Sequence, residues 1–230
     1  MAKTHMDKKG LMETRLIIFD FDGTLGDTRR NIVKTMQMTL AELHLPGRSE
    51  EECAATIGLP LYRCFETMFP ELQKDVIRCC ETTYRRIFAE NLQMVKPQPF
   101  PEVVETLSAL REQGYTLTIA SSRSHASLAE LTHDMGIADC ISYLVGADDV
   151  VNAKPDPEPV LNTLRAMGFE AGQALVVGDM AVDILMGVRA GAKTCGVTWG
   201  NGSRLELEQG GADYVIGSMG ELMGILHAEQ

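Results

Sequence analysis

Short apolar runs alternate with longer stretches of helical periodicity along most of the chain. The apolar runs are continuous rather than interrupted at every second position, a pattern typical of strands that are covered on both faces of a sheet. We expect six such strands, at Leu16–Phe19, Tyr115–Ala120, Tyr143–Val145, Ala174–Val177, Lys193–Val197 and Tyr214–Ile216.

Amphipathic stretches between these runs end just before glycines, which are favoured past a helix C-terminus because they adopt the left-handed conformation. Strands and helices that alternate with short connections predict an α/β fold, a Rossmann-like doubly wound parallel sheet. The expected helices are Glu102–Gln113, Ser124–Met135, Pro157–Met167 and Ala181–Ala190, and the glycines that follow them are Gly114, Gly136, Gly168 and Gly191.

One segment, residues 28–98, breaks the alternation, because it shows helical periodicity and no convincing strand. A proline-rich connector near Pro97 follows it. We therefore predict an inserted α-helical cap domain at residues 28–98 and a core built from residues 14–27 and 99–230, with hinges near Gly26 and Pro97. A long helical excursion that packs immovably on the core is the alternative.

Composition limits the possible partners. The chain has 230 residues, of which 45% are hydrophobic, and a net charge of −11. It has no dense run of Lys and Arg, so we expect no nucleic-acid partner. An acidic protein that binds an anion needs a local means to overcome its own field, such as a divalent cation or a helix N-terminus.

The six cysteines include no CxxC pair, so zinc is poorly supported. Residues 1–14 lack the apolar segment of a secretory signal, and no stretch approaches the ~20 apolar residues of a membrane span. We therefore expect a cytoplasmic protein with no membrane partner, in which the thiols stay reduced.

Two aspartates follow the first expected strand directly. Asp20 and Asp22 are two residues apart, so on an extended chain they project to the same side. Two carboxylates that are this close repel each other and need a cation or a proton between them. Gly23 allows a sharp turn that exposes backbone amides to an anion, and Thr24 can donate a hydroxyl. An acidic turn that caps a helix is the alternative.

That alternative suits Asp27, which we expect to be the N-cap of a helix that begins at Thr28. It suits Asp20 and Asp22 poorly, because an apolar strand delivers them to the edge of the sheet. In open α/β sheets, ligands bind outside the carboxyl ends of the strands.

Further polar residues follow other strands and should reach the same edge. Ser121 follows the second strand, Lys154 lies between prolines, Asp179 ends the fourth strand, and Asp183 lies one helical turn further on. The acid pair suits Mg²⁺, a hard ion that takes a few carboxylates. Taken singly, Ser121 could cap a helix, Lys154 could be solvated, and Asp183 could interact with the helix dipole.

Together these segments resemble the four motifs of the haloacid dehalogenase superfamily, in its phosphatase branch with a helical cap, and among these the phosphoglycolate phosphatase-like members. The motifs are Asp20-Phe21-Asp22-Gly23-Thr24-Leu25, Ser121, Lys154, and Gly178-Asp179 with Asp183. The resemblance covers nearly the whole chain after Thr14. The first and last motifs are specific, whereas a single serine and a single lysine are not.

The resemblance implies a role for each acid. Asp20 would be the nucleophile, and Asp22 would be the general acid and base. Mg²⁺ would be bound by Asp20, by the backbone carbonyl of Asp22 and by Asp179. Asp183 would orient metal-bound water or Lys154.

The resemblance also implies groups that hold the substrate. The phosphoryl oxygens would be bound by the amide or side-chain groups of Gly23, Thr24, Ser121, Ser122 and Lys154. Arg63, in the expected cap, could reach the leaving group, but an exposed helix arginine is at least as good an interpretation. An aspartate at position 22 favours phosphoester chemistry, because members that remove halide lack it.

We therefore expect an Mg²⁺-dependent phosphatase that hydrolyses a small phosphorylated metabolite through an aspartyl-phosphate, as a monomer or a weak homodimer. Phosphoglycolate is the first choice of substrate, and inorganic pyrophosphate, a nucleotide and a sugar phosphate stay open. A phosphomutase of the β-phosphoglucomutase type is an alternative, although Leu61 stands near the position where such relatives carry an arginine. A phosphoacceptor module without turnover, similar to a receiver domain, is another.

Overall fold

The computed structural model describes residues 13–94 and 96–229 of the chain. Within them, six parallel strands form one sheet in the order β5-β4-β1-β6-β7-β8. The predicted parallel α/β sheet is therefore confirmed. The strands are β1 Leu16–Phe19, β4 Thr116–Ala120, β5 Tyr143–Val145, β6 Ala174–Gly178, β7 Lys193–Val197 and β8 Tyr214–Ile216.

Strand β1 lies in the middle of the sheet, between two strands that are distant in sequence. Its last residue, Phe19, is in register with Ile119 of β4 and Val177 of β6. The three strands run in the same direction, so their carboxyl ends lie at one edge. The residues that follow them, including Asp20 and Ser121, consequently emerge side by side.

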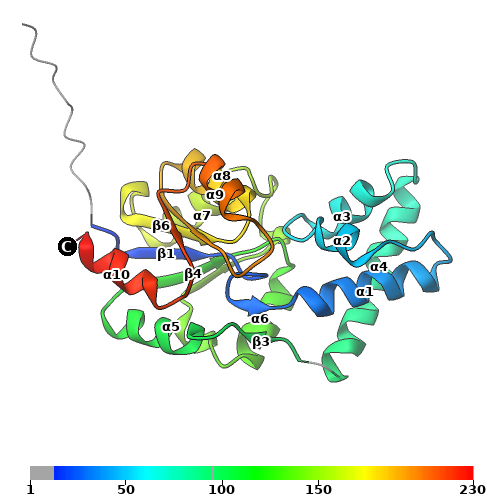
Figure 1. Ribbon diagram of the computed structural model, residues 1–230, viewed down its shortest axis with the longest axis horizontal. Coiled ribbons are helices and arrows are strands. Elements are labelled where there is room, and N and C mark those ends of the chain that lie inside the picture. The colour runs from blue at the N-terminus through cyan, green and yellow to red at the C-terminus, as the bar shows by residue number, and fades with distance from the viewer. Residues whose placement is uncertain (1–12, 95, 230) are drawn as a thin grey trace, which may run out of the picture.

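Helices cover both faces of the sheet (Figure 1). Side chains alternate along β1: Ile17 and Phe19 belong to one buried cluster, and Leu16 and Ile18 belong to another. This two-sided burial explains the continuous apolar pattern of the strand. The first face is covered by α5 Val103–Glu112, α6 His125–Asp134 and α10 Glu221–Ala228, and the second by α7 Glu158–Met167, α8 Ala181–Ala190 and α9 Arg204–Gln209.

The connections on these faces include short 3₁₀ helices, η1 Ala138–Cys140, η2 Ala147–Asp149 and η3 Ala171–Gln173. Helices α7 and α8 end at Gly168 and Gly191, which adopt φ angles of 75° and 77°. Gly114 and Gly136, which directly follow the C-cap residues of α5 and α6, adopt φ angles of 90° and 69°, so the predicted left-handed glycines are present after all four helices. None of the described helices has both the length and the apolar composition needed to cross a membrane.

The described part of residues 28–96 forms a separate group of helices at one end of the molecule (Figure 1). In its described residues it contains no strand from Thr28 to Lys96. Whether these helices move as a cap stays a prediction. They are α1 Arg29–Glu42, α2 Glu50–Ala54, α3 Leu61–Met68 and α4 Lys74–Met94.

Two short strands mark the points where the chain leaves the core and returns. β2 Gly26–Asp27 pairs antiparallel with β3 Gln98–Pro99. The sequence gives no sign of this pairing. The expected N-cap role of Asp27 is wrong: Thr28 occupies the N-cap position of α1, and the exposed Asp27 lies in β2 instead.

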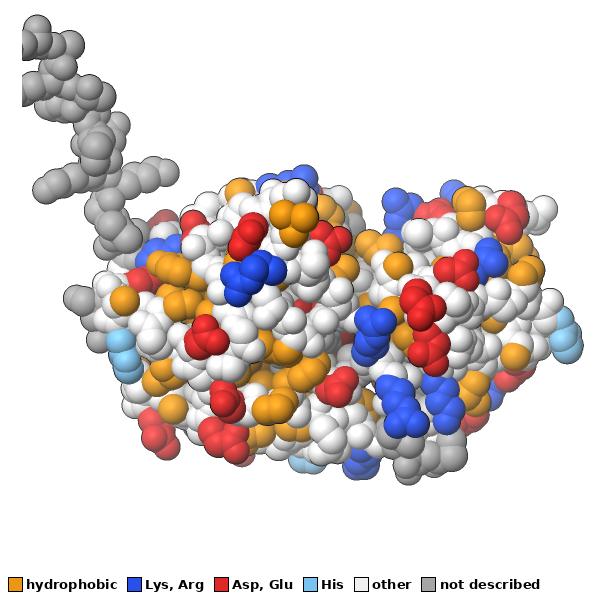
Figure 2. Space-filling view, viewed as in Figure 1, with side chains coloured by type: hydrophobic (Ala, Val, Ile, Leu, Met, Phe, Trp, Pro, Cys, Tyr) orange, Lys and Arg blue, Asp and Glu red, His pale blue; other side chains and the backbone are white. Residues whose placement is uncertain are grey.

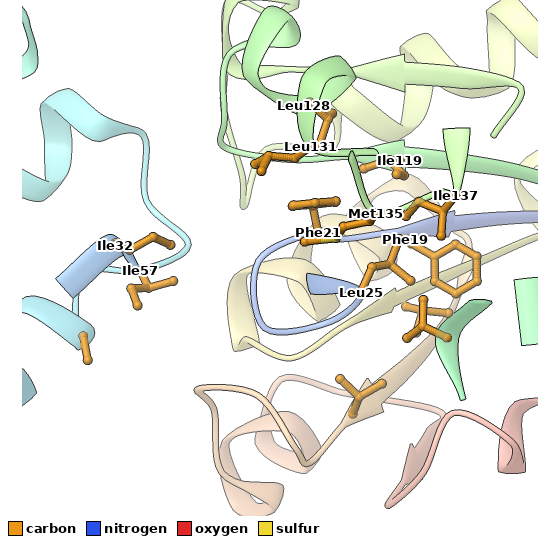
Figure 3. Close-up of a cluster of buried hydrophobic side chains, with 14 of the residues drawn as sticks. Phe19, Phe21, Leu25, Ile32, Ile57, Ile119, Leu128, Leu131, Met135 and Ile137 are labelled. Atoms are coloured by element: carbon orange, nitrogen blue, oxygen red, sulfur yellow. The ribbon is translucent and has the colours of Figure 1, made fainter. Parts of the chain in front are cut away.

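The cap helices and the core are packed together. Ile32 of α1 and Ile57 of the α2–α3 connection belong to the same cluster of buried hydrophobic side chains as Phe21 of the core (Figure 3). The Ser122 hydroxyl donates a hydrogen bond of 2.6 Å to the carbonyl of Gly58. The molecule narrows between the two parts (Figure 2). These helices are therefore in direct contact with the core.

Candidate active site

A tight loop after β1 positions the first aspartates. The Asp20 amide still bonds to the Val177 carbonyl at 2.8 Å, which extends the sheet pairing by one residue. The chain then turns, because Leu25 and Gly26 both donate to the carbonyl of Phe21. Gly23 sits in this turn at φ 88°, where a Cβ atom would lie 2.3 Å from Asp179 Oδ2. Only glycine fits at that position.

Lys154 joins two acids from different elements. Its Nζ atom lies 2.6 Å from Asp20 Oδ1 and 2.7 Å from Asp183 Oδ1. All three side chains are less than 10% exposed. Burial opposes the charge on Lys154, but the two carboxylates outweigh it and raise the pKa of the ammonium above its ordinary value. The lysine is therefore a fixed positive charge beside Asp20.

The other acids are held by the loops around them. Asp183 Oδ2 accepts a hydrogen bond of 3.0 Å from the Met180 amide, at the start of α8. Asp179 Oδ2 accepts two bonds from Asn201, one from the backbone at 2.7 Å and one from the side chain at 3.1 Å. The Thr24 hydroxyl donates to Asp179 Oδ1 at 3.2 Å. Thr24 thus contacts one of the acids, and its role in phosphate binding stays a prediction.

Carboxylate oxygens of Asp20, Asp179 and Asp183 lie within 4.8 Å of one another. One ammonium group balances these three buried acids, so their summed charge is negative. Burial, together with the neighbouring acids, raises the pKa of Asp20 well above its ordinary value and that of Asp179 to about 6. A set of buried hard oxygen ligands with excess negative charge fits Mg²⁺.

Asp22 lies outside this cluster and is bound by Arg123. Arg123 Nε lies 2.8 and 2.7 Å from the two carboxylate oxygens of Asp22, and Nη2 lies 2.7 Å from Oδ1. The Thr28 hydroxyl donates to the same Oδ1 at 2.5 Å. The guanidinium also lies 4.8 Å from the centre of the Phe88 ring in the cap. Sequence reasoning missed Arg123, although its place two residues after Ser121 was a signal.

Other predicted residues have different surroundings. Ser121 is buried at the end of β4, and its Oγ accepts a bond of 3.3 Å from the Arg123 amide. The Ser122 hydroxyl bonds to Gly58 of the cap rather than facing the acids. Arg63 is exposed and forms an ion pair with Glu66 on its own helix, so the structure does not bring it to the site.

A cavity of about 490 Å³ lies between the cap and the core, and Asp22 and Arg123 form part of its wall. It is bounded by α1, the α2–α3 connection, α4 and the residues after β4. The cap side of its wall is mostly apolar. Its apolar residues include Ile32, Met36, Ile57, Leu59, Tyr84 and Phe88.

The sequence matches a known family over most of its length. A family model of haloacid dehalogenase-like hydrolases covers residues 17–197, the stretch from β1 to the end of β7. The chain belongs to the haloacid dehalogenase-like hydrolase family. The family resemblance inferred from the four motifs is thereby confirmed.

Relatives of this hydrolase are named as phosphatases. It is 34% identical to the probable phosphatase IndB of Dickeya dadantii, over 93% of this chain and 94% of that one. It is 32% identical to the pyrophosphatase PpaX of Halalkalibacterium halodurans, over 94% and 98% of the two chains. A crystal structure from Haemophilus somnus, described as a predicted phosphoglycolate phosphatase, superposes with a TM-score of 0.83 and 25% identity. The superposition covers 94% of this chain and 99% of that one.

Proposed function

We propose that this haloacid dehalogenase-like hydrolase is an Mg²⁺-dependent phosphatase that acts on a small phosphorylated metabolite through an aspartyl-phosphate on Asp20. One observation carries the proposal. Asp20 lies at the carboxyl end of β1, bonded to Lys154, in a buried cluster with Asp179 and Asp183. Phosphoryl transfer needs mainly positioning and charge neutralisation, and this arrangement offers both.

The chemistry has two balanced steps. A carboxylate oxygen of Asp20 forms a bond to phosphorus while the bond to the leaving oxygen breaks, and Asp22 gives that oxygen a proton. Asp22 then removes a proton from water as the water oxygen attacks phosphorus, and the Asp20–phosphorus bond breaks. Inorganic phosphate is released, and both aspartates return to their first state.

The chain's own residues bind and orient the phosphoryl group. Lys154 and the amides of the loop at Gly23 would neutralise and hold its oxygens, with Ser121 at the neighbouring strand end. Mg²⁺ would be held by Asp20, the carbonyl of Asp22 and Asp179, and when bound it supplies positive charge that lets a phosphate dianion approach a carboxylate. Asp183 keeps Lys154 in place.

Pyrophosphate and phosphoglycolate, which occur in the names of the relatives, are both candidate substrates, and phosphoglycolate was the first choice from sequence. A mutase finds less support, since Leu61 lines the cavity where a second phosphate would need a cation. A cytoplasmic location and a monomer or weak homodimer stay predictions.

The test is phosphate release from acetyl phosphate, a small substrate that makes little demand on the cavity, with Mg²⁺ and with EDTA. We expect release only with Mg²⁺, and its loss by at least 100-fold in Asp20→Asn. Asp27→Asn, which changes an exposed acid outside the site, is the matched control and should retain the parent rate. Turnover that persists in Asp20→Asn would overturn the covalent route.

The role of Asp22 needs a separate variant. Asp22→Asn should slow the overall reaction at least 100-fold while its first step can still label Asp20, because only the proton transfers are lost. The label can be detected as a mass increase of one phosphoryl group on the peptide that contains Asp20. Full turnover in Asp22→Asn would contradict the general acid and base assignment.

A further inference from the structure

The cavity between cap and core shares a wall with the catalytic centre. Asp22 lines the cavity, and it is the residue that faces the leaving oxygen in the proposed reaction. The two residues joined by the hydrogen bond between the core and the cap, Ser122 and Gly58, also line this cavity. The part of the substrate that departs with the leaving oxygen would therefore occupy this cavity.

The cavity is large compared with the smallest candidate leaving groups. Its volume of about 490 Å³ lies within the range of about 300–1,000 Å³ found for pockets that bury whole organic ligands. Glycolate or a single phosphate group would leave most of it without protein contacts. Its apolar and aromatic wall, with Tyr84 and Phe88 stacked at 5.7 Å, gains most from contact with an apolar surface.

The charged residues of the wall disfavour an anion. Arg123 is neutralised by Asp22, and Arg85 lies 3.6 Å from Glu81 on the same helix. Two acids, Glu130 and Asp148, then remain without a compensating cation in the wall. When Asp22 carries the proton that it gives to the leaving oxygen, three acids still face two cations, so the wall has an excess negative charge in either state. The charged residues of the wall are the acids Asp22, Glu81, Glu130 and Asp148 and the cations Arg85 and Arg123. A carboxylate or a second phosphate would be repelled there.

We infer that the hydrolase selects phosphomonoesters whose leaving group is an uncharged organic group with an apolar face. The inference rests on the proposed phosphatase activity and narrows its substrate class. It places phosphoglycolate and pyrophosphate among the poor substrates of this chain, because the leaving groups, glycolate and phosphate, are charged and too small to fill the cavity.

The first test compares substrates that differ in one charge. Benzyl phosphate and 4-carboxybenzyl phosphate have leaving groups of similar shape and reactivity, but the second carries a carboxylate. We expect kcat/KM for benzyl phosphate to exceed that for 4-carboxybenzyl phosphate, phosphoglycolate and pyrophosphate by at least 10-fold. Equal or better turnover of any of these anionic substrates would overturn the inference.

The second test changes the cavity without changing the catalytic centre. Ala89 is exposed on α4 and lines the cavity, so Ala89→Trp should fill part of it without disturbing the core. We expect kcat/KM for benzyl phosphate to fall at least 10-fold and that for acetyl phosphate to change less than 2-fold. Thr82→Trp, at an exposed position of α4 outside the wall, is the matched control. An unchanged rate with benzyl phosphate in Ala89→Trp would show that the leaving group lies elsewhere.

The third test alters the charge of the wall. Glu130→Gln removes one of the uncompensated acids and should narrow the preference for benzyl over 4-carboxybenzyl phosphate several-fold, whereas Glu112→Gln, an exposed acid of α5, should not. An unchanged substrate preference in Glu130→Gln would contradict the charge argument.

Phosphate release from acetyl phosphate distinguishes failure of the inference from failure of the proposed function. If Asp20-dependent release from it persists without the benzyl preference, only the inference fails, and if that release is absent, the proposed function fails and the inference with it.

Discussion

Asn201 donates two hydrogen bonds to a single carboxylate oxygen of Asp179, from its backbone at 2.7 Å and from its side chain at 3.1 Å. Its side-chain oxygen in turn accepts a bond of 3.2 Å from Arg29, at the start of the first cap helix. Asn201 therefore links the acid cluster to the cap. It does so from the loop after β7, a segment that the motif analysis did not use.

Asn201→Ala should weaken Mg²⁺ binding. The loss of the side-chain bond lets Asp179 rotate away from the other acids, and removal of such an outer partner typically costs about 10–100-fold in metal affinity. Titration of activity with Mg²⁺ should show a higher half-saturating concentration, with a smaller change in the rate at saturation. A fall in the saturated rate alone would contradict a positioning role. Asn152→Ala, at an exposed asparagine, is the control.

Lys154→Met should abolish activity, with a loss of at least 100-fold in kcat. The ammonium is the positive charge that the chain itself places against Asp20 and Asp183, and its removal leaves buried carboxylates uncompensated. Circular dichroism and phosphate release would be measured together, with the exposed Lys34→Met as control. A folded Lys154→Met protein with the parent kcat would refute the assignment.

Without metal, the protein should be less stable at pH 7.5 than at pH 5.5. Burial raises the pKa of Asp179 to about 6 in the folded state, above its ordinary value of 3.8. Between these two pKa values the folded state binds more protons than the unfolded state. The stabilisation that protonation of Asp179 provides is therefore complete below pH 4 and is lost as pH rises through 6. Asp179 alone contributes about 1 kcal/mol of this difference, or about 2–4 °C in Tm.

Thermal unfolding in EDTA at the two pH values measures this effect. Asp179→Asn removes the titrating group, so it should reduce the difference and should raise Tm at pH 7.5 while destroying activity. Mg²⁺ should raise Tm at pH 7.5 in the parent protein and much less in the variant. A metal-free Asp179→Asn protein that melts below the parent at pH 7.5 would contradict the prediction.

Arg123→Lys should lower kcat by about 10-fold or more although the charge is kept. A lysine cannot contact both oxygens of Asp22 and lie over the Phe88 ring at the same time. The general acid would then be less well oriented, and the contact between core and cap would weaken. Kinetics on acetyl phosphate test the first effect, and limited proteolysis near Pro97 tests the second. Parent kinetics in Arg123→Lys would show that the bidentate contact is unimportant.

The sequence predicted the core of the site because that part depends on local order. Asp20, Ser121 and Asp179 each follow a buried strand, and parallel strands deliver such residues to one edge whatever the detailed packing. Lys154 was singled out by the prolines around it, and Asp183 by its place one helical turn after Asp179. Helix ends shifted by a residue, as at α5 and α6, because end positions depend on single backbone hydrogen bonds.

The parts that sequence did not predict depend on contacts between distant segments. Three side chains near the site donate hydrogen bonds to distant residues of the chain: Thr24 to Asp179, Ser122 to Gly58 and Arg123 to Asp22. No local sequence pattern distinguishes these hydrogen bonds from contacts with a ligand. Arg63 shows the opposite case, since its helix carries it to the surface beside Glu66. Side-chain partners across a cap and a core are fixed only once the two are packed together.

The pairing of β2 with β3 has a consequence for how this hydrolase can diversify. The exit and return points of the insert, Gly26 and Pro99, are direct neighbours in that ribbon. Whatever lies between two such anchored ends can be lengthened, shortened or exchanged without stretching the chain that holds the acids. New substrate preferences can therefore arise by replacement of the inserted helices as one module, while the residues of the catalytic centre keep their positions.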